Sequence, residues 1–107
     1  MGSIAECTEA TFERDVLQSP NVVLLDFWGP TCGPCKALEP ILEQVAAAHP
    51  DRLRVLKVNV SEQTGLAVRF AVRSLPTLLF FKDGKVAEQM VGRAALPAIE
   101  KTLARLL

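Results

Sequence analysis

The sequence predicts an α/β protein in which a mixed β-sheet lies between helices. Two observations carry this prediction: apolar extended runs alternate with segments of helical period over most of the chain, and a hairpin signal followed by an amphipathic segment closes it. The 107 residues suit one hydrophobic core and are too few for two, so a single domain over residues 1–107 is expected. Half of the residues are hydrophobic and 22% are charged, which favours a folded chain over a disordered one.

The first part of the chain is expected to form a short strand and a helix. Residues 4–7 are predicted to be extended. Thr8 is a suitable N-cap, and Phe12, Val16 and Leu17 then fall on one face of the helix that follows.

The next segment predicts a central strand and a long helix. Residues 22–28 place apolar side chains on both faces of an extended run, as is typical of a strand covered by helices on each side. After a loop, apolar residues recur at helical spacing up to His49, and Pro40 should bend this helix or leave one hydrogen bond open. The apolar positions of the helix are Leu38, Ile41, Leu42 and Val45.

The remaining elements are a strand, a short helix, a hairpin and a closing helix. Residues 53–60 are predicted to form a strand, and residues 61–64 a capping region for the short helix. Residues 77–81 and 86–91 flank Asp83-Gly84, so these two strands should be antiparallel. The apolar helix positions are Leu66, Val68 and Phe70, and then Leu96, Ile99, Leu103 and Leu106.

The composition of the chain argues against nucleic acids and membranes as partners. Twelve Lys plus Arg balance twelve Asp plus Glu, so no net charge attracts nucleic acid or anionic lipid. Apolar runs such as Val22–Leu25 are far shorter than the roughly 20 residues of a membrane-spanning helix. No secretory signal is recognised, and three cysteines suit intracellular thiol chemistry better than a secreted disulfide scaffold. We therefore expect a cytoplasmic protein with no nucleic-acid or membrane partner.

The strongest chemical signal is Cys32-Gly33-Pro34-Cys35, between a predicted buried strand and a helix. Cys32 lies where the helix begins, and unpaired amide groups with the positive end of the helix dipole favour its thiolate, so Cys32 is the predicted nucleophile. Cys35 lies one turn inside the helix and is expected to stay protonated until it acts as the resolving thiol. Gly33 permits close approach of the two sulfur atoms. Pro34 removes one amide donor, and the resulting moderate thiolate stabilisation favours a reductant over a strong oxidant.

The same motif is also compatible with a structural zinc site or a structural disulfide. A structural zinc site usually needs four Cys or His ligands, and only Cys7 and His49 remain, neither in a paired motif. A structural disulfide across so short a loop would constrain the unfolded chain little and would be poorly maintained in a reducing compartment. Cys7 itself is expected to be a small buried side chain, with a regulatory thiol as the alternative.

Asp26 is the second candidate, because it lies in the middle of the predicted buried strand. A buried carboxyl group without a partner should have a raised pKa. We expect Asp26 to accept a proton from Cys35 through a water molecule and to return it; the alternative is an acid held in structural hydrogen bonds. Lys57 in the neighbouring strand is a plausible cationic partner that tunes Asp26, unless its side chain simply extends to solvent.

A third signal is Leu75-Pro76-Thr77, ahead of an apolar strand. Pro76 cannot donate to a strand ladder, so it must start the strand or lie in a turn. The sequence alone makes a trans bond the default, since only about 5–6% of X-Pro bonds in folded proteins are cis.

Together these features resemble the thioredoxin family, over nearly the whole chain and in the family's order and spacing. The motifs that carry the resemblance are Asp26-Phe27-Trp28, Cys32-Gly33-Pro34-Cys35-Lys36 with Pro40, Leu75-Pro76-Thr77, Phe81-Lys82-Asp83-Gly84 and Val91-Gly92. The resemblance implies a thioredoxin fold, with a central five-stranded mixed β-sheet flanked by four α-helices. It also implies a cis bond at Pro76 that faces the cysteines. The implied substrate-binding residues are Trp28, Gly33, Pro34, Leu75, Pro76 and Gly92.

The same resemblance implies a general dithiol–disulfide reductase. Its targets would be disulfide-containing proteins, and thioredoxin reductase would recharge it with electrons that come from NADPH. It would act as a monomer, with the Cys32–Cys35 disulfide as its redox group and no bound cofactor or metal.

Three residues depart from the family pattern on the implied binding surface. Thr31 stands where many thioredoxins carry a tryptophan, which removes a large apolar contact. Ser74 stands where bacterial members often have glycine, and Arg93 where the family usually has a small residue. Arg93 is either a cation that selects acidic partners or an ordinary solvated arginine. We expect Ser74 and Arg93 to affect the range of substrates, and the dithiol chemistry to be kept.

Two functions of other classes compete with the dithiol reductase. A protein-binding subunit could use the same apolar face without turnover, because a fold does not fix a function. An oxidase or isomerase of an oxidising compartment is disfavoured by the missing signal and by Pro34.

Overall fold

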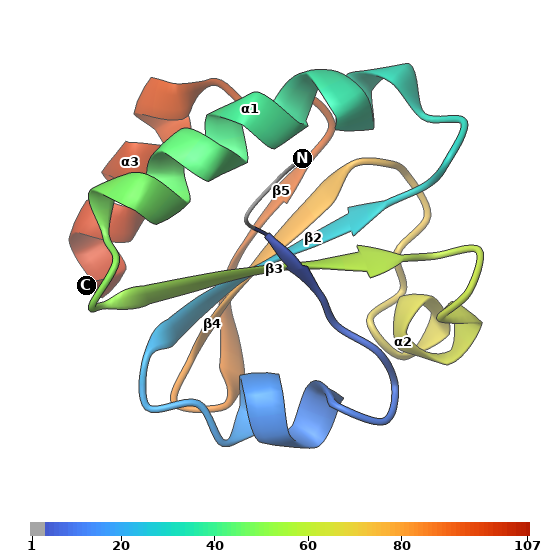
Figure 1. Ribbon diagram of the computed structural model, residues 1–107, viewed down its shortest axis with the longest axis horizontal. Coiled ribbons are helices and arrows are strands. Elements are labelled where there is room, and N and C mark those ends of the chain that lie inside the picture. Colours follow the sequence, from blue (N-terminus) through green and yellow to red (C-terminus); the bar gives the residue numbers. More distant parts are fainter. Residues whose placement is uncertain (1–3) are drawn as a thin grey trace.

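The computed structural model describes residues 4–107, so the first three residues of the predicted domain lie outside the description. Strands and helices alternate along the chain and end in a hairpin and a helix (Figure 1). In order, the elements are β1 (Ala5–Glu6), η1 (Glu13–Leu17), β2 (Val22–Trp28), α1 (Gly33–Ala48), β3 (Leu53–Asn59), α2 (Thr64–Arg69), β4 (Thr77–Lys82), β5 (Lys85–Val91) and α3 (Leu96–Leu106).

The five strands form one mixed sheet in the order β1-β3-β2-β4-β5, with β2 at its centre. Strands β1 and β2 each pair with β3 in parallel. Strands β2 and β4, and β4 and β5, are antiparallel, which confirms the predicted hairpin around Asp83-Gly84. Both Asp83 and Gly84 have positive φ, as this kind of tight turn requires.

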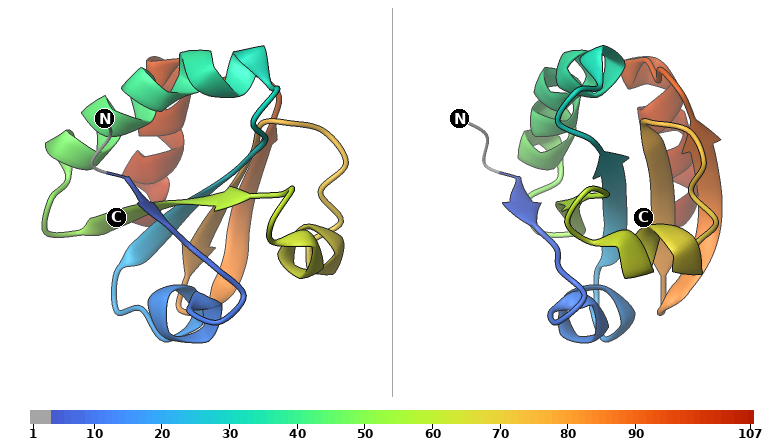
Figure 2. Two further views of the ribbon diagram at one scale, coloured as in Figure 1. Left: turned by 45° about the vertical axis from the view of Figure 1, so that its right-hand side comes forward. Right: turned by 90° about the vertical axis from the view of Figure 1, so that its right-hand side faces the viewer.

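Helices cover both faces of the sheet. Figures 1 and 2 show α1 and α3 on one side, and η1 and α2 on the other. The buried side chains form two clusters accordingly, and β2 supplies both: Leu24 belongs to the cluster under α1 and α3, whereas Leu25 and Phe27 belong to the cluster under η1 and α2. Successive side chains of a strand point to opposite faces, which explains why residues 22–28 are apolar at every position except Asp26.

The prediction that Thr8 caps the first helix is wrong. That helix, η1, is a five-residue π-helix with Phe12 at its N-cap and no side-chain cap. Thr8 instead closes a turn with Thr11: the Thr11 amide donates to Thr8 Oγ1 at 3.2 Å, and the Thr8 amide donates to Thr11 Oγ1 at 3.0 Å. The two hydroxyl groups thus satisfy the local backbone, and the helix starts later. With η1, residues 4–107 have four helices, the number that the resemblance implies, although η1 is a π-helix and the other three are α-helices.

The short helix α2 lies where expected, but two of its details differ from the prediction. Val68 is 79% exposed, because a residue two positions after Leu66 points to the other side of a helix. Gln63 is the N-cap of α2, but its side chain does not cap the helix: the Gly65 amide donates to Glu9 Oε2 at 2.7 Å, and the Glu9 amide donates to Gln63 Oε1 at 2.9 Å. The turn before η1 therefore holds the first turn of α2.

Helix α1 carries Cys32-Gly33-Pro34-Cys35 at one end and contacts α3 at the other. It contains Pro40, whose ring nitrogen has no proton to donate within the helix. His49 is its C-cap, and His49 Nε2 lies 2.8 Å from Glu100 Oε1 on α3. Within residues 4–107, no helix combines the length and apolar character needed to cross a bilayer.

Candidate active site

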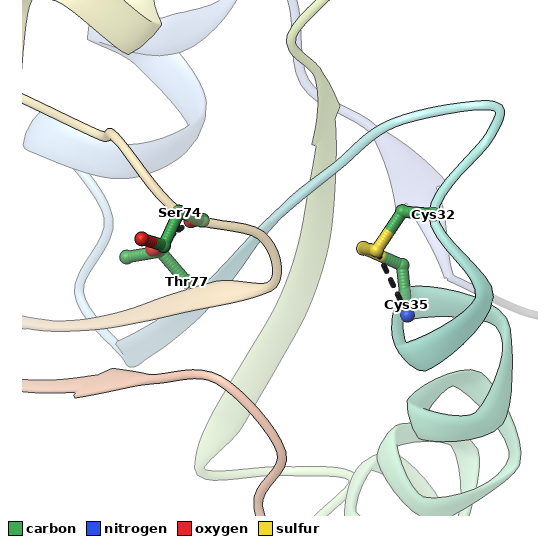
Figure 3. The surroundings of a disulfide bond; sticks show 4 residues. All are labelled: Cys32, Cys35, Ser74 and Thr77. Carbon is green, nitrogen blue, oxygen red and sulfur yellow. Dashed lines mark hydrogen bonds between the residues drawn. A yellow bond between two sulfur atoms is a disulfide. The ribbon is translucent and has the colours of Figure 1, made fainter.

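The two motif cysteines lie at the start of α1, directly after the loop that follows the central strand. Cys32 is the N-cap of α1, and it forms a disulfide with Cys35 across a Cα–Cα distance of 5.3 Å. The backbone amide of Cys35 donates to Cys32 Sγ at 3.1 Å (Figure 3). Amide groups in the first turn of a helix have no partner within it, so the sulfur of Cys32 takes the place of a capping oxygen. The same environment favours negative charge on this sulfur once the disulfide is reduced.

Burial distinguishes the two sulfur positions. Cys32 is half-buried, whereas Cys35 is only 4% exposed. Gly33 and Pro34 between them are exposed, and Pro34 occupies the first helical turn, where a missing N–H is tolerated. A target disulfide that approaches from solvent therefore reaches Cys32 before Cys35.

Three loops meet near the disulfide. The Leu75–Pro76 bond is cis, as the resemblance implies and against the default for a single sequence. The Gly92 amide donates to the Pro76 carbonyl at 2.8 Å, so the loop after β5 adjoins the loop before β4. A Cβ placed on Gly29 would lie 3.0 Å from Leu75 Cδ1, so Gly29 permits close contact between this loop and the loop before Cys32.

The loop that leads into β4 is held by its own hydrogen bond. Thr77 Oγ1 donates to the Ser74 carbonyl at 2.6 Å, and Figure 3 shows the disulfide sulfur atoms on the side of α1 that faces this loop. Ser74 is exposed, Leu75 is half-buried and Pro76 is buried. The loop thus presents backbone next to the redox pair while its proline anchors the start of β4.

The remaining predicted surface residues lie around this centre. Trp28 is half-buried at the end of β2, and its Nε1 is buried without a hydrogen-bond partner among residues 4–107. Arg93 is exposed and follows Gly92. A groove of about 410 Å³ runs between the start of α1 and the loop before α3. Its lining residues are Pro34, Ala37, Leu38, Ile41, Arg93, Ala94 and Ala95.

Asp26 is buried in the centre of β2, as expected, with 3% of its surface exposed. Its Oδ1 has no hydrogen-bond partner among residues 4–107. Burial, together with the negative charge of Glu39, raises the pKa of Asp26 from 3.8 to about 7, although Lys57 acts in the opposite direction. The carboxyl group can therefore both accept and release a proton near neutral pH.

The structure corrects the pairing expected for Lys57. Asp26 and Lys57 are neighbours in the register of β2 and β3, yet Lys57 Nζ donates to Glu39 Oε2 at 2.8 Å and lies 3.9 Å from Glu6 Oε2. The ammonium group is drawn to these two acids, which are more exposed than Asp26, so it influences Asp26 through space without bonding to it. The sequence pattern did not single out Glu39. Its position one helical turn after Cys35 was the available signal.

The structure does not bring the other candidate ligands to the cysteine pair. Cys7 is completely buried in the cluster under η1 and α2, and His49 caps the far end of α1. Among residues 4–107, no group of three or more His, Cys, Asp or Glu side chains is placed to hold a metal ion. The complete burial of Cys7 confirms that it is a small buried side chain, as predicted.

The fold and the site together define a class of protein. A cysteine pair caps the helix that follows the central strand, a cis-proline loop lies beside it, and a buried carboxyl group lies behind it. This is the arrangement of a thiol–disulfide oxidoreductase.

The family model "Thioredoxin" matches residues 3–105. The chain is similar to Thioredoxin 1 of Synechococcus elongatus, with 40% identity over 103 residues that cover 96% of each chain. It is 47% identical to the thioredoxin of Acidithiobacillus ferridurans over 90 aligned residues, and these residues make up 84% of this chain and 83% of the relative. It is 43% identical over 89 residues to the thioredoxin of Pseudomonas aeruginosa, which covers 83% and 82%. The chain therefore belongs to the thioredoxin family and is a dithiol–disulfide oxidoreductase whose redox group is the cysteine pair.

Proposed function

We propose that this chain is a general protein-disulfide reductase in which Cys32 attacks the target and Cys35 releases it. The observation that carries this proposal is the unequal placement of the two sulfur atoms. Cys32 Sγ accepts the Cys35 amide at 3.1 Å, and Cys32 is half-buried, whereas Cys35 is buried. An attacking thiol must be accessible and ionised, and a resolving thiol must be close and held back.

In the first step the Cys32 thiolate attacks one sulfur of the target disulfide. A bond forms between Cys32 Sγ and that sulfur, the target disulfide breaks, and the other target sulfur leaves as a thiolate that takes a proton from solvent. The product is a mixed disulfide between the two proteins.

In the second step Cys35 becomes the nucleophile. Its thiol proton passes to the carboxylate of Asp26, its sulfur attacks Cys32 Sγ, and the second target sulfur leaves as a thiolate, which takes up a proton as Asp26 releases one. The target has then gained two electrons and two protons, and the Cys32–Cys35 disulfide has formed. Asp26 suits this transfer because its pKa of about 7 lets it be ionised in part of the molecules at neutral pH.

Target recognition is assigned to the surface around the disulfide. Trp28, Leu75 and Pro76 would provide apolar contacts, and the free backbone near Ser74 would pair with an extended target segment. Gly92 would let the target backbone approach, and Arg93 beside the apolar groove would favour targets with acidic residues near their disulfide. Gly33 and Pro34 would set the redox poise through the limited number of amide donors around Cys32.

The proposal includes recycling in the cytoplasm by a thioredoxin reductase that draws electrons from NADPH. The chain would act as a monomer, since its attacking sulfur and the loops around it lie on one surface of a single copy.

The test is an assay in which NADPH oxidation is coupled to reduction of a disulfide-bonded protein by the chain and a bacterial thioredoxin reductase. Turnover that requires both Cys32 and Cys35 is the expected result. The competing protein-binding function predicts two other results. The reductase would not reduce the chain, and the double Cys32→Ser, Cys35→Ser variant would still perform the protein's role in the cell.

A further inference from the structure

A cavity of about 130 Å³ lies beside the resolving cysteine and gathers ionisable groups from three elements. Strand β2 contributes Asp26, β3 contributes Lys57, and α1 contributes Cys35, Lys36 and Glu39. Glu6 of β1 approaches the same lysine from the edge of the sheet. Leu78 of β4, the register partner of Asp26 on its other side, is uncharged. The charges around Asp26 therefore come from the α1 and β3 side.

Three carboxyl groups of this cluster compete for the ammonium group of Lys57. Lys57 Nζ donates to Glu39 Oε2 at 2.8 Å and lies 3.9 Å from Glu6 Oε2. Asp26 is the register partner of Lys57 on the adjacent parallel strand, but Asp26 Oδ1 is left without a partner among residues 4–107. The short hydrogen bond to Glu39 thus directs the side chain of Lys57 towards α1 and not towards Asp26.

Glu39 can hold the lysine because of its place on α1. Residues four apart lie on the same face of a helix, so Glu39 follows Cys35 by one turn towards the cavity. The helix that presents the redox pair therefore also carries the group that fixes Lys57. The lysine side chain is only 17% exposed, whereas that of Glu39 is 36% exposed, so solvent reaches this contact mainly from the side of the glutamate.

We propose that Glu39 is a positioning residue that anchors Lys57 away from Asp26, so that the carboxyl group of Asp26 adjoins Cys35 without a bonded counter-ion. This inference rests on the role proposed for Asp26 as the proton acceptor of Cys35. Without the anchor, the lysine side chain is free to turn to its register partner. A salt-bridged carboxylate holds its charge more strongly and is a weaker base for the thiol of Cys35.

The first test replaces Glu39 with its neutral isostere, Glu39→Gln, and follows the carboxyl carbon of Asp26 by NMR during a pH titration of the oxidised protein. We expect the titration midpoint of Asp26 to fall by about one pH unit, because a cation within bonding reach lowers the pKa of an acid by this order. Glu43→Gln, one turn further along α1, is the matched control and should leave the midpoint in place. An unchanged midpoint in Glu39→Gln would overturn the proposal.

A second comparison separates the anchoring of Lys57 from the charge of Glu39 itself. The same titration is made on Lys57→Gln and on the double variant with Glu39→Gln. If Glu39 acts by holding the lysine, its replacement should lower the midpoint by less than about half as much when Lys57 is already absent. An equal fall in both backgrounds would mean that only the charge of Glu39 matters, and the positioning role would be wrong.

The rate at which the mixed disulfide resolves, measured against pH, then tests the link to catalysis. We expect the profile of Glu39→Gln to move to lower pH together with the Asp26 midpoint. A shifted midpoint with an unmoved rate profile would support the anchoring of Lys57 by Glu39 and would overturn the proton-acceptor role of Asp26.

Discussion

Two cysteines three positions apart in one helical turn have different surroundings, and this difference decides their chemistry. Cys32 accepts an amide hydrogen bond at its sulfur, and Cys35 is 4% exposed. We expect Cys32→Ser to abolish disulfide reduction, and Cys35→Ser to attack targets and stall as a stable mixed disulfide, because the resolver is missing. Mass spectrometry of the trapped adducts would check this. Faster alkylation of Cys35 than of Cys32 in the reduced chain at mildly acidic pH would contradict the assignment.

Asp26 makes the stability of the fold depend on pH. Its pKa is about 7 in the folded chain against 3.8 for an ordinary aspartate, so the folded state binds the proton more tightly than the unfolded state. The pH-dependent cost of burying this group is therefore absent at low pH, grows as the pH rises from about 4 to about 7, and is complete above that range. We expect Asp26→Asn to be more stable by roughly 4 kcal/mol at most at mildly alkaline pH, and to lose this advantage in acid.

Urea unfolding of the oxidised proteins across this pH range measures the difference. Asp51→Asn, an exposed aspartate, is the control and should change stability by no more than a few tenths of a kcal/mol. The resolving step of Asp26→Asn should be slower, so that rate and stability change in opposite directions. A variant with unchanged turnover would leave Asp26 with a structural role only.

The sequence predicted those site residues whose role is marked by their immediate neighbours in the chain. Cys32 and Cys35 are adjacent to a strand end and a helix start, and Asp26 interrupts an apolar run, so each could be identified without knowledge of the fold. The pairing of Lys57 could not. It depends on how α1 packs over β3, since Glu39 reaches the lysine only once the helix is docked on the sheet.

At the scale of elements, the contact between the turn before η1 and the first turn of α2 is open to test. Glu9 Oε2 accepts the Gly65 amide, and α2 has no other side-chain cap among residues 4–107. We expect Glu9→Ala to lower the free energy of unfolding by about 1 kcal/mol, the usual cost of a lost helix cap. Glu9→Gln keeps an acceptor oxygen and should lose less. Hydrogen exchange of the Gly65 amide should accelerate in Glu9→Ala, and equal stability of all three proteins would contradict the capping role.

Periodicity predicted the elements whose burial follows from their own sequence. Strand β2, helix α1 and the β4–β5 hairpin all lie where alternation, helical spacing and Asp83-Gly84 placed them. Two of the errors, those on the caps of η1 and α2, have a different origin. Thr8 bonds to Thr11 rather than to a helix, and the cap of α2 comes from Glu9 far away in the sequence. The Thr8–Thr11 turn is a local side-chain bond that competes with the helix, whereas the Glu9–Gly65 contact depends on tertiary packing, which a window of neighbouring residues does not contain.

At the scale of the whole molecule, the groove beside the disulfide predicts a preference among targets. Its walls are mostly apolar, and the exposed Arg93 at its rim forms no ion pair within the described part of the chain. We expect Arg93→Ala to lower kcat/KM for targets with acidic residues near their disulfide by about two- to fivefold at low salt, and less at high salt, because exposed charge pairs contribute little and are screened.

Arg52→Ala is the matched control for Arg93→Ala. It removes the same charge from an exposed site next to the chain's C-terminus, where Arg52 lies near Leu107. Steady-state assays of both variants with an acidic and a neutral target of similar sequence measure the preference. Equal losses for the two targets would show that Arg93 is an ordinary solvated arginine.

The complete enclosure of Cys7 gives the protein an internal reporter. Its sulfur lies in the cluster under η1 and α2, and burial raises the pKa of its thiol. A thiol that is both protonated and sealed off can be labelled only while the packing around it is open. In the oxidised protein Cys32 and Cys35 are joined in a disulfide, so Cys7 is the free thiol of the described residues. The rate at which a thiol reagent modifies Cys7 therefore reports how often the native structure opens around it, without an introduced probe.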